Sequence, residues 1–285
     1  MSDFDSGSNI FAGMIAKLAQ KDNSVPGDFR DDEGFLVCHV CHERKQLEID
    51  ILGHIRKVPR MCACARERDR QRQEEAAKSE AALHIRRLQE KGIADPKYLK
   101  ARIEADDRSN PKVSDAVGRY VEKWDEMRKR NMGILFYGNV GTGKTFFAAC
   151  IANGLIDKGI SVLMTSIPSL ITAMSKDYGR DKPRLLAEIS SVPLLVLDDV
   201  GTERNTAYGY ELVQEIIDTR YRSGKPLIVT TNLAPSELQN PTDLRYKRVY
   251  DRMLEMCHPI LVDGASRREQ KAKAMRSEAR EILGL

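Results

Sequence analysis

Eight consecutive residues near the middle of the chain have the types and spacing of a loop that binds phosphate groups. Glycines let a backbone turn so that successive N–H groups point at one anion, a lysine supplies a charge for the outer phosphates, and a threonine hydroxyl is a ligand for Mg²⁺. The loop therefore predicts binding of a nucleoside triphosphate. It matches the pattern G-x-x-x-x-G-K-[ST] at every fixed position and consists of Gly138, Asn139, Val140, Gly141, Thr142, Gly143, Lys144 and Thr145.

Polar side chains stand at the ends of two apolar runs in the second half of the sequence: two adjacent acids end the first run, and one amide ends the second. Asp198 and Asp199 end one run, and Asn232 ends a later one. Ligands of parallel sheets bind beyond the carboxyl ends of the strands, so we expect Asp198 near a Mg²⁺ held by Thr145, and Asp199 near the attacking water. The Asn232 amide is placed to orient water or to contact the outer phosphate. The alternative for the two acids is a solvated strand end.

A later helical segment carries arginines that can neutralise charge during phosphoryl transfer, including in a neighbouring subunit. They are Arg245, Arg248 and Arg252. Their positions leave open which of them acts, and an ordinary surface role is the alternative for each.

Four cysteines in the N-terminal part have spacing compatible with one tetrahedral zinc ion. Cys38 and Cys41 form a C-x-x-C pair, and Cys62 and Cys64 form a tighter C-x-C pair. Such a site is structural, since protein ligands fill all four positions. Four reduced thiols without metal are the alternative, and three histidines are candidate substitutes for a cysteine: His39, His42 and His54.

Short apolar runs alternate with helical patterns in the second half of the chain. This alternation predicts an α/β fold in which helices cover both faces of a parallel sheet. A helix over 146–156 follows the glycine loop, and its N-terminal N–H groups add to the phosphate site. Another helix, with Ser114 as its cap, precedes the first strand. The expected strands lie near 134–137, 160–165, 193–198, 226–231 and 259–262.

The N-terminal half is more polar. Residues 10–20 place an apolar stripe on one helical face, which packs either on its own domain or on a partner protein. A long charged helix is expected over 65–90, either as a solvated spacer or as a contact for nucleic acid or protein. We expect the N-terminal helix and zinc domain over 1–64, a charged helical linker over 65–111, and the nucleotide-binding domain over 112–285.

Composition sets few further limits. The formal net charge is +4, with 46 basic and 42 acidic residues in a chain of 285, which permits contact with nucleic acid without arguing for it. The N-terminus does not look like a secretory signal and no run reaches membrane-spanning length, so no membrane contact is expected. With six cysteines and no export signal, the sequence predicts a cytoplasmic protein.

These motifs together resemble the AAA+ ATPases of the DnaC/IstB type over residues 114–268. The resemblance implies an AAA+ P-loop ATPase with a five-stranded parallel sheet between helices. The cysteine domain, the charged helix and the stretch 92–96 look like the DnaC-like replicative helicase loaders of phages and bacteria. The motifs that carry it are Tyr137-Gly-Asn-Val-Gly-Thr-Gly-Lys-Thr145, Leu194-Leu-Val-Leu-Asp-Asp-Val-Gly201, Thr219-Arg-Tyr-Arg-Ser-Gly-Lys-Pro226, Ile228-Val-Thr-Thr-Asn-Leu233 and Tyr250-Asp-Arg-Met253.

The resemblance also implies roles for single residues. Residues 138–145 correspond to the Walker A loop, and Asp198 and Asp199 to the magnesium acid and the water-activating acid of Walker B. Asn232 corresponds to sensor 1, Arg252 to an arginine finger that acts on a neighbouring subunit, and Arg268 to sensor 2. There are two departures: Arg267 replaces an aromatic residue usual in the family, and Asp199 stands where many members have glutamate. The shorter acid is consistent with slow hydrolysis.

What the resemblance implies is a self-assembling protein that, with ATP bound, contacts single-stranded DNA and a DnaB-like replicative helicase. Hydrolysis, which we expect to be slow and stimulated by DNA, then releases the helicase, and the N-terminal domain grips it. Whether the helix over 169–178 contacts DNA stays open. The alternatives are a transposition-helper ATPase of the IstB type and a non-hydrolysing, nucleotide-dependent binding module. A small-molecule kinase lacks a recognisable acceptor pocket or lid.

Overall fold

The computed structural model describes residues 23–51, 53–176, 182–201 and 207–284. The chain divides into two compact units, residues 1–82 and 83–285. The apolar stripe expected over 10–20 lies outside the described residues. Among the residues that are described, no helix combines the length and the apolar character needed to cross a membrane.

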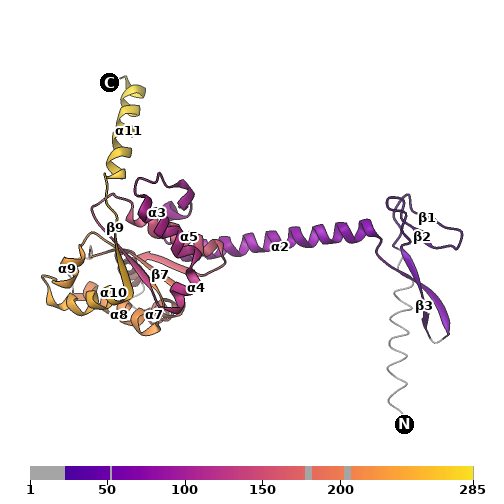
Figure 1. The fold of residues 1–285 in the computed structure, drawn as a ribbon, viewed down its shortest axis with the longest axis horizontal. Helices are drawn as coiled ribbons and strands as arrows, with labels where there is room; N and C mark the ends of the chain where they lie inside the picture. The colour runs from indigo at the N-terminus through magenta and orange to yellow at the C-terminus, as the bar shows by residue number, and fades with distance from the viewer. Residues whose placement is uncertain (1–22, 52, 177–181, 202–206, 285) are drawn as a thin grey trace, which may run out of the picture. The chain divides into compact units, whose positions relative to one another are not determined.

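The first unit is built from two small antiparallel pairs of strands (Figure 1). Strand β1 (Phe29–Arg30) pairs with β2 (Leu36–Val37), and β3 (Gln46–Ile51) pairs with β4 (His54–Pro59). Among its described residues, only a few apolar ones are buried: Phe35, Leu36, Val37, Cys38 and Cys62. So small a core ordinarily needs a further cross-link, such as a metal ion.

Helix α2 (Ala63–Gly92) confirms the long charged helix expected over 65–90. Most of its side chains are exposed, and ion pairs one turn apart, such as Arg70 with Glu67 and Arg86 with Glu90, support it. The helix begins in the first unit and ends in the second.

The second unit contains the expected five-stranded parallel sheet, with strand order β6-β7-β8-β5-β9. The strands read as nearly continuous apolar runs because helices cover both faces of the sheet. The observed bounds lie close to those expected from the sequence, and β7 extends further, through both acids. The strands are β5 (Gly133–Tyr137), β6 (Val162–Ser166), β7 (Leu194–Val200), β8 (Leu227–Thr231) and β9 (Cys257–Leu261).

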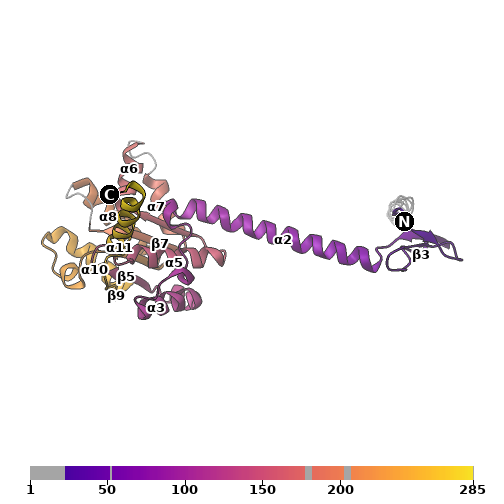
Figure 2. The same cartoon turned by 90° about the horizontal axis from the view of Figure 1, so that it is seen from above.

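Two apolar clusters lie on the two faces of this sheet. Figure 2 shows the helices that surround the sheet. The first cluster joins the sheet to α3 (Pro111–Glu122), α4 (Trp124–Lys129) and α5 (Lys144–Asp157). The second joins it to four further helices: α6 (Ile167–Lys176), α7 (Lys182–Ser191), α8 (Ala207–Ser223) and α10 (Lys247–Met256). The helix after the glycine loop therefore packs on the same face as α3.

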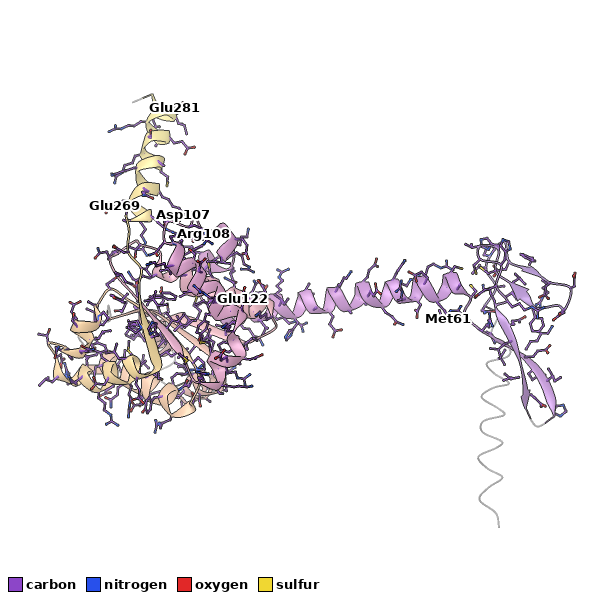
Figure 3. The ribbon with its side chains drawn as sticks, viewed as in Figure 1. Met61, Asp107, Arg108, Glu122, Glu269 and Glu281 are labelled. Carbon is purple, nitrogen blue, oxygen red and sulfur yellow. The ribbon has the colours of Figure 1, made fainter. Side chains whose placement is uncertain are left out.

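Helix α11 (Arg267–Leu283) leaves the body of the second unit after its first turn. None of its residues is buried, and Figure 3 shows the side chains from Glu269 to Glu281 standing in the open. Short helical segments complete the unit: α9 (Pro235–Gln239) and the 3₁₀ turns Pro96–Tyr98, Ile103–Ala105 and Leu244–Tyr246.

The expected cap of the helix before the first strand is wrong. Helix α3 begins at Pro111 with Asn110 at the N-cap, because proline is well suited to the first helical position. Ser114 lies inside the helix and is buried. Its hydroxyl donates to the carbonyl oxygen of Asn110 at 3.0 Å and to the carboxylate of Asp106.

Residues 83–111, which the sequence assigns to a linker, pack within the second unit. Ile93 and Ala101 are buried in the cluster that contains α5. Ile93 forms a parallel bridge to Met164, and the Ala94 N–H donates to the Met164 carbonyl at 3.1 Å. Residues 93 and 94 therefore lie along β6, the edge strand of the sheet.

Candidate functional site

The glycine loop connects β5 to α5, as the sequence predicts. Gly138 and Gly141 have φ of 139° and 85°, in the region that favours glycine. A Cβ on Gly138 would lie 2.5 Å from the Val262 carbonyl oxygen, and one on Gly141 would lie 2.2 Å from the Ser266 hydroxyl. Both positions therefore require glycine for conformation and for space.

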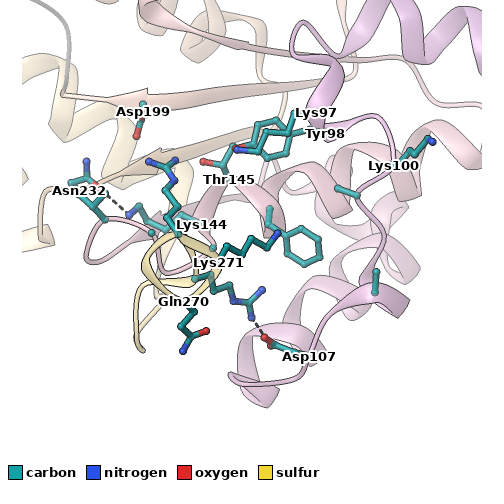
Figure 4. A pocket seen from close by; sticks show the side chains of 18 residues that line it. Lys97, Tyr98, Lys100, Asp107, Lys144, Thr145, Asp199, Asn232, Gln270 and Lys271 are labelled. Atoms are coloured by element: carbon teal, nitrogen blue, oxygen red, sulfur yellow. Dashed lines mark hydrogen bonds and ion pairs between the residues drawn. The ribbon is translucent and has the colours of Figure 1, made fainter. Parts of the chain in front are cut away.

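Lys144, the first residue of α5, is buried, with 6% of the residue exposed. Its ammonium group donates to the carbonyl oxygens of Gly138 at 2.8 Å and Asn139 at 2.7 Å. It also donates to the Asn232 side-chain oxygen at 2.8 Å, an interaction drawn in Figure 4. Burial lowers the pKa of Lys144, while the charges of Asp199 and Asp198 act in the opposite direction. The loop lysine and the strand-end amide thus meet directly.

Asp198 lies between two threonine hydroxyls from different elements. Thr145 hydrogen-bonds to its side chain, and the Thr230 hydroxyl donates to it at 2.6 Å. Burial raises the pKa of the Asp198 carboxyl, and both hydroxyls lower it. A carboxylate beside the loop threonine is the oxygen donor set that Mg²⁺ prefers, so these residues fit the ion expected here.

Asp199 has a left-handed backbone, with φ of 57°. Its N–H donates to the Thr230 hydroxyl at 2.9 Å, and the register between β7 and β8 shifts between Leu197 and Val200. Such an irregularity redirects a side chain at a strand end. Asp199 lines the same cavity as Lys144 and Asn232, and Figure 4 shows all three facing it.

A cavity of about 560 Å³ joins these groups, a size typical of pockets for small ligands. One end is formed by the loop, Asp199, Asn232 and Arg268. The other end is formed by residues 97–107, including Tyr98, Ala101 and Asp107 (Figure 4). Sequence reasoning missed this second wall because the stretch looks like a polar boundary with turn residues.

Arg268 lines the cavity, and its positive charge acts on both Lys144 and Asp198. Arg252 does not line the cavity. Its guanidinium pairs with the Asp218 carboxylate on α8 and lies 5.2 Å from the centre of the Tyr221 ring. Arg245 pairs with Asp243 at 2.6 Å. The structure thus brings most of the sequence-predicted site residues together: the glycine loop, both acids, Asn232 and Arg268. Arg252, the candidate arginine finger, lies elsewhere on the same unit.

The four N-terminal cysteines come together in the first unit. All four sulfur atoms lie within 4.8 Å of one another, and Cys64 Sγ is 3.5 Å from Cys38 Sγ and 3.4 Å from Cys62 Sγ. Tetrahedral zinc with Zn–S bonds of about 2.3 Å places sulfurs about 3.8 Å apart, so the arrangement fits this ion. His39 instead lies 3.1 Å from the Asp28 carboxylate.

The groups around the cysteines shift the pKa of two of the thiols in opposite directions. Backbone N–H groups, first that of Cys64, lower the pKa of Cys41 to about 6. The neighbouring thiols, Cys62 first, raise the pKa of Cys64 to about 12. Thiolates are the metal-binding form, and several of them accumulate at one point only if a cation offsets their charge.

The fold and the cavity together define a P-loop ATPase of the AAA+ type. The chain belongs to the family of IstB-like ATP binding proteins, whose model matches residues 77–275. The resemblance to the DnaC/IstB type is therefore confirmed, and ATP binding is a property of the family.

Among curated proteins, the replicative helicase loader DnaC of Escherichia coli strain K12 is 34% identical over 138 residues. The match covers 47% of this chain and 54% of that protein, so the chain spans about half the length of this relative. An ATP-binding protein in an insertion sequence of Mycobacterium tuberculosis is 27% identical over 211 residues, covering 70% of this chain and 79% of that protein.

Among solved structures, the chain is similar to a crystal structure of the DnaC helicase loader, with a TM-score of 0.51 and 27% identity. The superposition covers 59% of this chain and 100% of the other.

Proposed function

We propose that this chain is an ATP-dependent DNA replication protein that loads a replicative helicase onto single-stranded DNA, with ATP hydrolysis as the release step. The observation that carries the ATPase part is the meeting of Lys144, Thr145, Asp199 and Asn232 at one cavity, with Asp198 hydrogen-bonded to Thr145 beside it. The helicase part is supported by the similarity to DnaC over 138 residues and by the cysteine-containing first unit.

In this proposal Lys144 exchanges its carbonyl and amide partners for the outer phosphates of ATP. Thr145 and Asp198 are the residues that would hold Mg²⁺, which would supply positive charge to the phosphate oxygens. Asp199 accepts a proton from the attacking water, and Asn232, released from the lysine, orients that water. Arg268 adds a second positive charge at the same end of the cavity.

The test compares two variants of the full chain. Lys144→Ala should abolish ATP binding, whereas Asp199→Asn should bind ATP with near wild-type affinity and lose hydrolysis. Equilibrium binding and phosphate release measure the two effects, and Lys129→Ala, on the exposed surface of α4, is the matched control. A wild-type chain that binds ATP without DNA-stimulated turnover would favour a nucleotide-dependent binding module instead.

Helicase loading itself is tested by mixing the full chain, ATP, the helicase and a circular single strand. Helicase should become bound to the circle with wild type and not with Lys144→Ala. Failure of the ATP-bound wild type to bind any replicative helicase would contradict the proposal.

A second candidate is a transposition-helper ATPase of the IstB type, favoured by the similarity to the insertion-sequence protein of M. tuberculosis. A transposition helper would use the same ATPase site as a helicase loader but would bind a different partner protein. Binding to a transposase, with none to helicase, would select this candidate. For either function we propose self-assembly through the ATPase domains, with Arg252 presented to the site of a neighbour.

A further inference from the structure

Arg267, the first residue of α11, connects three distant parts of the second unit. A single guanidinium nitrogen, Nη2, lies 3.1 Å from the Asp106 carboxylate, 2.7 Å from Asp107 and 2.8 Å from the Ser109 hydroxyl. About a quarter of the Arg267 side chain is exposed, while that of Asp106 is completely buried. A charged hydrogen bond with one partner buried is stronger than a surface pair.

Arg267 also contacts the phosphate loop. Its backbone N–H donates to the Gly141 carbonyl oxygen at 2.9 Å. The guanidinium carbon lies 5.7 Å from the ring centres of both Phe146 and Phe147, in the first turn of α5. A Cβ on Gly143 would lie 3.5 Å from this guanidinium. The side chain therefore runs past the loop to reach the 106–109 segment.

The partner of Arg267 is itself held in place. The Asp106 carboxylate accepts hydrogen bonds from the Ser114 hydroxyl and, at 3.2 Å, from the Arg108 N–H. Ser114 belongs to α3, which packs on α5 in the same apolar cluster. Arg267 is thus bound to a carboxylate that is itself held by helix α3. Figure 4 shows Asp107 at the end of the cavity opposite Asp199 and Asn232.

We propose that Arg267 is a positioning residue of the ATP site, whose pairs with Asp106 and Asp107 hold Arg268 toward the phosphate end of the cavity. This inference rests on the proposed ATPase function. Arg268 follows directly in the same helical turn, and the rest of α11 has no buried residue that could fix its direction. The contacts of Arg267 with Gly141, Asp106 and Asp107 therefore fix the backbone position from which the Arg268 side chain extends into the cavity.

This arrangement makes a specific thermodynamic prediction. If Arg267 acts through Arg268, the two residues form one unit and their effects on nucleotide affinity are not additive. If Arg267 instead contacts the nucleotide independently, or supports only the fold, the effect of replacing it is the same whether or not Arg268 is present.

The experiment measures the dissociation constants of ATP and ADP for the full chain and six variants by calorimetry. Arg267→Met should weaken ATP binding about tenfold, within the range of couplings between neighbouring residues, and should weaken ADP binding less. In an Arg268→Ala background the same substitution should change ATP affinity less than about twofold. Arg276→Met, an exposed arginine further along α11, is the control and should match wild type.

Asp107→Asn tests the same inference from the partner side, because more than half of its side chain is exposed and no buried charge loses its partner. It should shift ATP affinity in the same direction by about threefold, also only when Arg268 is present. Equal shifts in both backgrounds, or a lower melting temperature with unchanged ATP affinity, would overturn the inference. A wild-type chain that does not bind ATP would contradict the proposed function instead.

Discussion

At the scale of single residues, Thr230 contacts both acids of the site. Its hydroxyl donates to Asp198 at 2.6 Å and accepts from the Asp199 N–H at 2.9 Å. The next residue, Thr231, points to the other side of the strand and donates to the Val200 carbonyl at 2.7 Å. One hydroxyl therefore contacts the Asp198 carboxylate, which we assign to magnesium, and the backbone of Asp199, whose carboxylate we assign to water.

A pH dependence follows from the position of Asp198. Burial raises the pKa of this carboxyl above the ordinary value of about 4, so the proton stays bound to a higher pH. Because only the carboxylate binds Mg²⁺, ATPase activity should fall on acidification at a pH above that value. The Thr230 hydrogen bond lowers the pKa, so Thr230→Val should move the acidic limb to still higher pH.

The measurement is kcat/KM for Mg-ATP against pH. Thr231→Val is the matched control, since its hydroxyl contacts Val200 and not Asp198. Superimposable profiles of wild type and Thr230→Val would show that the Thr230 hydroxyl does not set the pKa of Asp198.

Arg252 is paired within its own chain, with 19% of its side chain exposed. If it acts on a neighbour, the pair with Asp218 has to open when subunits assemble. Arg252→Ala should suppress hydrolysis and leave ATP affinity nearly intact. Mixing it with Lys144→Ala should restore part of the activity, because the second variant supplies the missing arginine.

Two further variants separate the explanations for Arg252. Asp218→Asn breaks the ion pair and keeps the arginine, so hydrolysis should persist if the guanidinium acts in a neighbour. Loss of activity in Arg248→Ala but not in Arg252→Ala would assign the role to the other arginine of α10.

At the scale of elements, the cysteine cluster brings together two segments of the first unit. The turn after β2 supplies Cys38 and Cys41, and the start of α2 supplies Cys64, with Cys62 directly before it. We expect about one equivalent of zinc in protein purified without chelator, because folding of so small a core is coupled to metal binding. Elemental analysis measures it.

Replacing Cys38 and Cys41 together with serine should remove the zinc and unfold this unit. His54→Ala is the control, because this exposed side chain lies outside the four-sulfur cluster. Metal-free wild-type protein would disprove the zinc site.

At the scale of the whole molecule, residues 1–82 and 83–285 are separate compact units, and the cavity belongs wholly to the second. We therefore propose that ATP turnover and helicase binding are separable. A fragment of residues 1–90 should retain the replicative helicase in a pull-down without nucleotide, because the proposed contact lies in the cysteine-containing unit. The same fragment carrying Cys38→Ser and Cys41→Ser should not retain it. Helicase retained only by the ATPase unit would contradict this division.

The sequence by itself determined the features that are local or periodic. The phosphate loop is contiguous, and its glycines specify the conformation whatever surrounds them. Alternating apolar runs predicted the five strands and the two helical layers, because burial on both faces of a parallel sheet leaves a continuous apolar pattern. The gathering of Asp198, Asp199 and Asn232 followed from their places at strand ends.

Only the tertiary structure decided the rest of the site. Residues 97–107 have no periodic pattern, and packing of Ile93 and Ala101 in the core brings them to the cavity. The roles of Thr230 and Arg267 depend on strand register and on a contact across 160 residues to Asp107. Side-chain direction and long-range pairing arise from packing, which no local sequence pattern encodes.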